Sequence, residues 1–387
     1  MLIRSQLHLT AALAAVLIAH VPTACFGYAD DQAEIESLLE QVLALQQRAD
    51  HYSADFTDEA VYEWKDSTDR FRNELSIVRH NKLLDVAGDI WLGREGFPAQ
   101  RIRAVVNEKV CVQYSFDPEK FDAAKGGVAW VKKRDAQLHR TIEVDGGPLD
   151  GYGDETNGQR LAEVLLEAED PKSMKEGEIN GITCAVVEGD SNVGLIMLWI
   201  TKDVPHRVLR YRFAKDSDDP LFGKTIAELG KMGAKYGNMA IKSWTAMLDD
   251  IVYESVDDEL FPIAGRLAVV NVMEDGTELQ QTHQYNRTNV RVGIDAVKDH
   301  DFTTDLREGA NITFTDDNVA DSGNNYAWVD GFPKLISTDV ARPPADLAEL
   351  VEDPNEDNGS NKWVILGTIT VALLAAVGFT VWKTNAG

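Results

Sequence analysis

Histidines and acidic residues, the side chains that most often carry catalysis or bind metals, occur in this chain without the spacing that either role requires. No GxSxG, HExxH, P-loop or strand-linked GxGxxG motif is present. The histidines beyond residue 30 are scattered and share no ligand spacing: His51, His80, His139, His206, His283 and His300. The sequence therefore predicts no catalytic residue, no metal site and no cofactor, and we expect a protein that is not an enzyme.

One segment, 145–155, combines glycines with acidic residues in the way that calcium loops do. It departs from the EF-hand pattern at two positions. Tyr152 stands where an Asp or Asn ligand is required, and Glu155 stands where the turn needs glycine. Calcium binding is therefore not expected at this segment.

Two cysteines, Cys111 and Cys184, remain after the predicted signal sequence. They could form one disulfide in an oxidising compartment. Both lie in strand-like runs, however, so two buried thiols are an equally good interpretation. The sequence leaves both possibilities open.

The apolar stretch 195–213 points to binding rather than to catalysis. Its six uninterrupted apolar residues, LIMLWI, form a strand in which Leu195, Met197 and Trp199 share one face. Ile196, Leu198 and Ile200 share the other face, so we predict that both faces are covered, one by the core and one by a second apolar layer. The residues that we predict to line a ligand cavity are Leu195, Met197, Trp199, Leu209, Tyr211, Phe213, Val112 and Tyr114. We favour the Trp199 face as the ligand side because Met and Trp adapt to irregular apolar ligands.

These residues must be positioned by a mixture of helices and strands. Apolar side chains at helical spacing predict an amphipathic helix over 31–49, and a second helix is predicted over 159–170 behind a capping box of Thr156 and Gln159. Period-two alternation predicts strands over 71–78, 101–106 and 109–116, three strands within 181–213, and more over 244–255, 266–274 and 277–292. Asp275-Gly276 is a hairpin signal. The order predicts an α+β fold with a large antiparallel sheet.

The N-terminus predicts export. Residues 1–29 have a positive charge at Arg4, an apolar run and small residues before an acidic start, which is the order of a signal peptide. The body, 30–337, is then expected outside the cytoplasm, on the periplasmic side.

The C-terminus predicts a membrane anchor. Residues 363–382 carry no charge over about twenty residues, enough to cross one hydrocarbon core, and Trp363 and Trp382 stand where interfacial aromatic residues are found. The acidic segment 338–362 is expected to be a flexible tether. The tail, 383–387, is expected in the cytoplasm, which makes the chain a single-pass membrane protein.

The net charge of −26 argues against one class of partner. A nucleic-acid-binding protein needs a basic stripe for phosphate contacts, and none is visible. We therefore expect no nucleic acid as a partner.

The succession of elements resembles the bacterial LolA-type lipoprotein-carrier fold. The segments that carry the resemblance are RADHYSADFTDE (48–59), the strands of 181–213, VYESVDDELFPIAGRLAVVNVMEDG (252–276) and DFTTDLREGANITF (301–314). The resemblance implies a strongly curved, half-barrel-like sheet that wraps around helices and leaves an apolar hollow. In characterised members that hollow holds lipid acyl chains.

Two functions follow as expectations. The first is a membrane-anchored extracytoplasmic protein that binds a lipid, a lipoprotein or another hydrophobic ligand in an apolar cavity. The second is an envelope sensor or protein-interaction module that uses the same fold and reports through another membrane protein. Typical carriers of this family are soluble, so the predicted span of this chain argues against free shuttling between membranes.

Overall fold

A computed structural model describes the chain between residues 28 and 337, with gaps. The described residues are 28–48, 50–64, 67–91, 100–108, 110–116, 129–133, 147–153, 156, 158–221, 224–229, 240–304, 306, 311–316, 319–320 and 325–337. Their helices are α1 (Tyr28–Arg48) and α3 (Leu161–Glu167), with short 3-10 turns η2 (Gly147–Asp150) and η3 (Ile294–Ala296). Their strands are β1 (His51–Trp64), β2 (Ser67–His80), β3 (Leu83–Trp91), β4 (Gln100–Val106), β5 (Val110–Phe116), β6 (Ala129–Lys133), β7 (Ser173–Ile179), β8 (Ile182–Ser191), β9 (Gly194–Thr201), β10 (Val208–Lys215), β11 (Pro220–Leu221), β12 (Lys224–Thr225), β13 (Ile241–Val256), β14 (Glu259–Met273), β15 (Glu278–Val292), β16 (Asn311–Asp316), β17 (Val319–Ala320), β18 (Asn325–Val329) and β19 (Phe332–Ser337).

Seventeen of the described strands form one sheet. Hydrogen-bonded neighbours run in the order β7-β8-β9-β10-β13-β14-β15-β1-β2-β3-β4-β5-β6, and every one of these pairs is antiparallel. Strand β16 then joins β6 in parallel, and β17, β18 and β19 continue from it. The predicted large antiparallel sheet is confirmed, with the β16–β6 pair as its exception.

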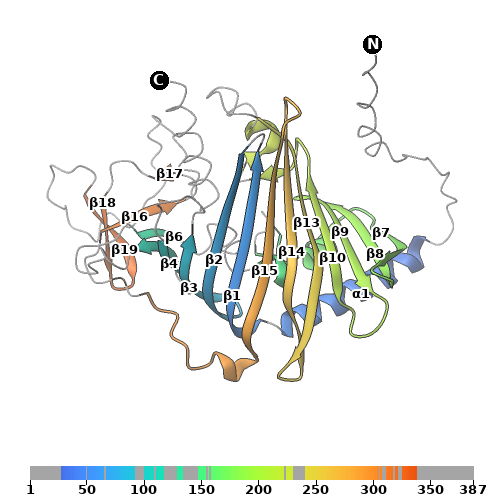
Figure 1. Cartoon of the computed structure of the whole chain (residues 1–387), viewed down its shortest axis with the longest axis horizontal. Helices are drawn as coiled ribbons and strands as arrows, with labels where there is room; N and C mark the ends of the chain where they lie inside the picture. Colours follow the sequence, from blue (N-terminus) through green and yellow to red (C-terminus); the bar gives the residue numbers. More distant parts are fainter. Residues whose placement is uncertain are drawn as a thin grey trace, which may run out of the picture.

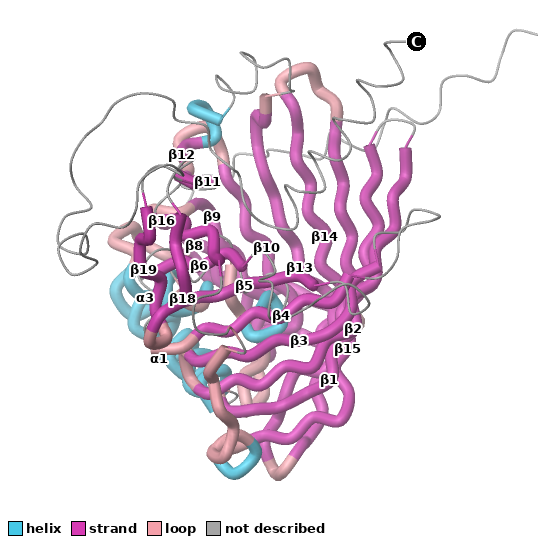
Figure 2. The backbone as a smooth tube through the Cα atoms, turned by 90° about the vertical axis from the view of Figure 1, so that its left-hand side faces the viewer, coloured by secondary structure: helices cyan, strands magenta, loops and turns pink. Residues whose placement is uncertain are grey.

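The two helices lie on one face of the sheet, which we name the inner face; the opposite one is the outer face. Figure 1 shows α1 crossing behind β7, β8 and β10, and Figure 2 shows the sheet bending around α1 and α3. The main hydrophobic core is enclosed between these helices and the inner face. This arrangement matches the predicted curved sheet with packing helices.

Helix α1 buries the apolar stripe that the sequence predicts for it. Its core-facing residues are all at most 9 % exposed: Ile35, Leu38, Leu39, Val42 and Leu45. The helix begins at Tyr28, three residues before the predicted start at residue 31. Helix α3 is shorter than predicted and its N-cap is Arg160, whose backbone amide donates to the carboxylate of Glu163 at 3.4 Å. The predicted capping box of Thr156 and Gln159 is therefore wrong.

Strand β9 shows how its apolar run is divided between the two faces. Ile196, Leu198 and Ile200 are at most 2 % exposed and belong to the core. The alternate side chains, Leu195 and Met197 among them, are only half-buried. The prediction that both faces of this strand are covered therefore holds for the inner face, against which the helices pack. On the outer face the side chains are only half-buried.

The hairpin predicted at Asp275-Gly276 is confirmed as the turn between β14 and β15. Gly276 adopts φ +80° there, a conformation that glycine reaches without steric cost. The amide of Met273 donates to the carbonyl of Thr277 at 2.8 Å and closes the turn.

Both predicted membrane-related regions fall outside what the structure describes. The signal is undescribed up to residue 27, and the tether, span and tail occupy 338–387, which are also undescribed. Among the described residues, no helix combines the length and apolar character needed to cross a membrane.

Candidate ligand-binding site between helix α1 and the sheet

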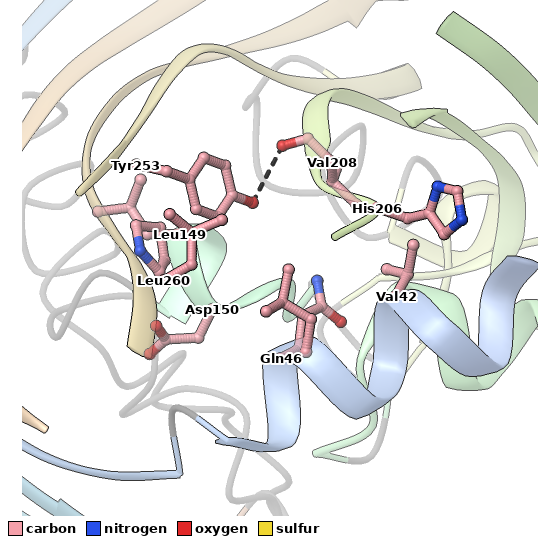
Figure 3. A pocket seen from close by; sticks show the side chains of 10 residues that line it. Val42, Gln46, Leu149, Asp150, His206, Val208, Tyr253 and Leu260 are labelled. Atoms are coloured by element: carbon pink, nitrogen blue, oxygen red, sulfur yellow. Dashed lines mark hydrogen bonds between the residues drawn. The ribbon is translucent and has the colours of Figure 1, made fainter. Parts of the chain in front are cut away.

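A narrow cleft opens between the C-terminal half of α1 and the inner face of the sheet (Figure 3). Helix α1, turn η2, the start of β10 and the adjoining ends of β13 and β14 each contribute to its wall. The lining residues are mostly apolar: Val42, Leu45, Gln46, Leu149, Asp150, His206, Val208, Tyr253, Leu260 and Pro262. The cleft is thus an apolar slot with a few polar groups, which is the usual composition of a small-molecule site.

The cleft is closed in this structure. The volume attributed to it, about 340 Å³, includes open solvent at its mouth. Its interior has room for about one water molecule. Among the described residues, core side chains from α1, α3 and the sheet fill the space between the helices and the sheet.

The floor of the cleft is fixed by a buried ion pair. Asp150 of η2 accepts two hydrogen bonds from the guanidinium of Arg287 on β15, at 2.7 and 3.0 Å. The hydroxyl of Tyr52 on β1 donates to the same carboxylate at 3.1 Å. The side chain of Arg287 is 0 % exposed and that of Asp150 is 2 % exposed. Arg79, also buried, lies 3.8 Å from the same carboxylate. Asp150 therefore compensates the buried charge of Arg287 and lies beside a second buried arginine.

Further arginines extend this cluster toward α3. The guanidinium of Arg160 donates to the backbone carbonyl of Asp150 at 3.0 Å and to the carboxylate of Asp50. Arg79 and Arg160 both lie over the ring of Tyr152, with guanidinium carbons 5.4 and 4.9 Å from its centroid. Turn η2 is therefore tied to β1, β2, β15 and the N-terminus of α3 by charged and aromatic contacts.

Tyr253 and Tyr152 stay uncharged. Burial raises the pKa of Tyr253 well above its ordinary value, although nearby Arg207 acts in the opposite direction. Its hydroxyl donates to the carbonyl of Val208 at 3.1 Å, which joins β13 to the start of β10 (Figure 3). Burial likewise raises the pKa of Tyr152. Neither phenol is arranged as an acid or base, and no group of three or more metal-binding side chains occurs among the described residues.

The residues that we predicted to line one cavity are divided between the two faces. Tyr211 and Phe213 pair with Leu198 and Ile196 across the β9–β10 ladder and lie in the inner core. Leu195, Met197 and Trp199 point the other way. No single cavity can therefore be lined by all of them.

A bulge in β10 explains why Leu209 lies on the outer face, as Leu195, Met197 and Trp199 do. The β9–β10 register shifts between Val208 and Arg210, so Leu209 leaves the alternation that the sequence predicts. It packs with Ile179, Cys184 and Trp199 in a small cluster separate from the main core. The guanidinium of Arg210 lies 5.7 Å from the centroid of the Trp199 ring.

The remaining predicted residues lie on β5, far along the sheet from β9 and β10. Val112 is fully buried but is not part of the main core between the helices and the sheet. Tyr114 is on the same strand, and its side chain lies outside the described part of the structure. Val112 does not line the cleft.

Cys111 and Cys184 are separate buried thiols rather than a disulfide. They belong to β5 and β8, which nine other strands separate in the sheet order. A disulfide requires Cα atoms within about 7 Å of each other. The alternative of two buried thiols is the one that the structure contains.

The sequence alone missed the polar residues of the site. Asp150 falls in segment 145–155, where calcium binding was not expected, and Arg287 lies in the predicted strand 277–292. The available signal was periodicity, since Arg287 follows Tyr285 by two residues and so shares its inner face. His206 was among the histidines without ligand spacing, and it lies at the cleft.

No protein-family model and no curated protein matches this chain. Solved structures do match it. A DUF1329 family protein from Desulfovibrio piger is 11 % identical with a TM-score of 0.35, over 67 % of this chain and 93 % of that one. A domain described as an outer membrane lipoprotein-sorting protein, from Vibrio parahaemolyticus, is 12 % identical with a TM-score of 0.37, over 69 % and 97 %.

A third match is LprF from Mycobacterium bovis, 8 % identical with a TM-score of 0.24, over 67 % of this chain and 93 % of that one. The matched proteins have the LolA-like fold. Their TM-scores are all below 0.5, so these matches carry no argument about what this chain binds.

Proposed function

We propose that this protein binds a lipid, the acyl chain of a lipoprotein or another elongated apolar ligand between α1 and the inner face of the sheet. The observation that carries the proposal is the apolar cleft at the end of α1, which continues into the main core. A cleft with room for about one water cannot hold an acyl chain as it stands. Binding therefore requires α1 to move away from the sheet.

Near its N-terminal end, α1 is fixed by two hydrogen bonds between the Gln32 side chain and the backbone of Lys172. The C-terminal half beside the cleft is suited to such a movement because side-chain packing is its main attachment. Its apolar stripe faces the core while the alternate residues are exposed or half-exposed. Its C-terminal end is held to β14 by one exposed ion pair, Arg48 with Glu259 at 3.9 Å. Exposed pairs of this kind contribute little to stability. An apolar ligand would replace the contacts that α1 gives up, so the movement need not expose the core to water.

Obstruction of the cleft tests this proposal. Leu260 is half-buried at the cleft, so Leu260→Trp should fill the opening and reduce binding of a fluorescent acyl probe by about tenfold or more. Binding would be measured on the full chain in nanodiscs, as the signal above that of empty nanodiscs. The matched control is Leu195→Trp, because Leu195 is also half-buried but lies on the outer face. Unchanged probe binding by the Leu260 variant, or equal losses in both variants, would overturn the proposed site.

A second candidate function is protein recognition through the outer face. Leu195, Met197 and Trp199 are half-buried there, and Ile182 beside them in the sheet is 42 % exposed. Apolar side chains with an arginine stacked on tryptophan are typical of the centre of protein interfaces. If this candidate is right, Trp199→Ala should abolish capture of a partner while acyl-probe binding stays intact.

We also propose that the body lies on the periplasmic side and is anchored by 363–382, with the tether 338–362 between them. The support is the sequence itself: an uncharged stretch of about twenty residues bounded by Trp363 and Trp382. A cysteine introduced at Ser360 should react with a membrane-impermeant thiol reagent in cells with a permeabilised outer membrane, and one at Thr384 should not. The reverse labelling pattern would contradict the proposed orientation.

A further inference from the structure

The cleft lacks a partner for an anionic head group. None of the described residues that line it is a lysine or an arginine. Its one charged residue, Asp150, is an acid whose carboxylate already binds Arg287. Two arginines next to the lining residues are already engaged, Arg287 with Asp150 and Arg207 with the ring of Tyr253. A carboxylate or phosphate placed in the cleft would therefore leave water without a free counter-ion among the lining residues, which is unfavourable.

Gln46 brings an unsatisfied hydrogen-bond acceptor to the same place. Its side-chain amide packs against Gly151, where a Cβ atom would stand only 2.2 Å from the Gln46 Nε2 atom. Gly151 also adopts φ +87°, so the backbone that seats this amide requires glycine. The Oε1 atom of Gln46 is buried and receives no hydrogen bond from the described residues. A buried acceptor without a donor is rare in native proteins.

His206 supplies a second acceptor. Its Nδ1 atom lies 2.8 Å from the backbone carbonyl oxygen of Thr201. Because a carbonyl oxygen only accepts hydrogen bonds, Nδ1 must carry the proton, and in the neutral ring Nε2 is then an acceptor. Figure 3 shows His206 and Gln46 on the two elements that border the cleft near Val42. The remaining polar side chain, Tyr253, already donates its hydroxyl proton to Val208.

From this inventory we infer that the ligand of the cleft is a neutral lipid whose polar end donates hydrogen bonds, through a hydroxyl or an amide N–H, rather than a fatty-acid or phospholipid anion. The inference rests on the proposed function, since it specifies the ligand of the same site. An acyl chain would lie among Val42, Leu45 and Leu260, and its head would reach Gln46 and His206.

Three competitors of equal chain length separate charge from hydrogen bonding. The full chain in nanodiscs is labelled with a photoreactive acyl probe, and competition is read as the loss of adduct on peptides that contain cleft residues. Monolauroylglycerol is neutral and has hydroxyl donors, methyl laurate is neutral without donors, and laurate at pH 8 is anionic. We expect monolauroylglycerol to compete about 2- to 10-fold better than methyl laurate, as one or two hydrogen bonds allow. Laurate should be the weakest of the three.

A matched pair of variants tests the acceptor. Gln46→Leu should remove the advantage of monolauroylglycerol over methyl laurate while adduct formation continues. The control is Gln41→Leu on the same helix, because Gln41 is exposed and bonds only within its own turn; this variant should keep the advantage.

The possible failures are distinguishable. If laurate competes as well as monolauroylglycerol, or if Gln46→Leu leaves the order of competitors unchanged, the inference about the head group is wrong while the proposed apolar site stands. If the probe forms no adduct on cleft peptides in the unaltered chain, the proposed function itself fails.

Discussion

Replacement of Asp150 by asparagine tests whether the floor of the cleft is held by charge. In the structure Arg287 has no exposed side-chain surface, and its two amino groups are 2.7 and 3.0 Å from the Asp150 carboxylate oxygens. Asp150→Asn keeps the shape but leaves the Arg287 charge without its bidentate partner. Breaking a buried pair in this way costs about 3–5 kcal/mol. This is a large part of a typical free energy of unfolding of about 5–15 kcal/mol.

The assay for this variant is urea unfolding followed by tryptophan fluorescence, with the midpoint and slope fitted separately. Asp89→Asn is the matched control, because Asp89 pairs with Arg101 at 3.2 Å while their side chains are 33 % and 48 % exposed; it should cost at most about 1 kcal/mol. The double variant with Asp150→Leu and Arg287→Met should recover only part of the lost stability, since it removes both charges of this pair but leaves buried Arg79 without the carboxylate that lies 3.8 Å from it. A loss below about 1 kcal/mol for Asp150→Asn alone would refute this account of the floor.

The other predictions concern the sheet. Leu198→Ala should lower the free energy of unfolding by about 2–5 kcal/mol because Leu198 is 2 % exposed in the core. Leu195→Ala, on the half-buried outer face, should lower it by well under about 2 kcal/mol. Equal losses in urea unfolding would contradict the assignment of faces. Burial, and then the like charge of His80, lowers the pKa of His51, so the unfolded chain binds more protons and stability should fall as the pH drops from about 6.5 toward the lowered folded-state pKa. His51→Gln should make the pH dependence of the unfolding midpoint shallower in that window, and an unchanged dependence would show that His51 does not contribute.

Local patterns in the sequence predicted the elements well, because those patterns depend on burial of one face. The stripe of α1 from Ile35 to Leu45 and the alternation of β9 each require only that one side meets the core. The hairpin at Asp275-Gly276 follows from the conformational freedom of glycine. These features could be predicted without knowing which elements become neighbours.

The candidate site could be predicted only in part, because it depends on contacts between distant segments. Asp150 and Arg287 are 137 residues apart, and only the register of β15 and the position of η2 bring them together. The bulge before Arg210 moves Leu209 to the outer face, and the sequence shows no sign of it. The choice of ligand-facing side also changed: we favoured the Trp199 face, whereas the cleft lies on the inner face that Leu198 shares.

The most direct test of the central claim is to map where a photoreactive acyl chain attaches to the protein. The full chain in nanodiscs is irradiated with a diazirine-bearing monoacylglycerol, digested and analysed by tandem mass spectrometry. Our account predicts adducts on Val42, Leu45 and Leu260, which line the cleft from α1 and β14, and their loss in the Leu260→Trp variant. Adducts confined to Leu195, Met197 and Trp199 on the outer face, or none in the folded body, would contradict it.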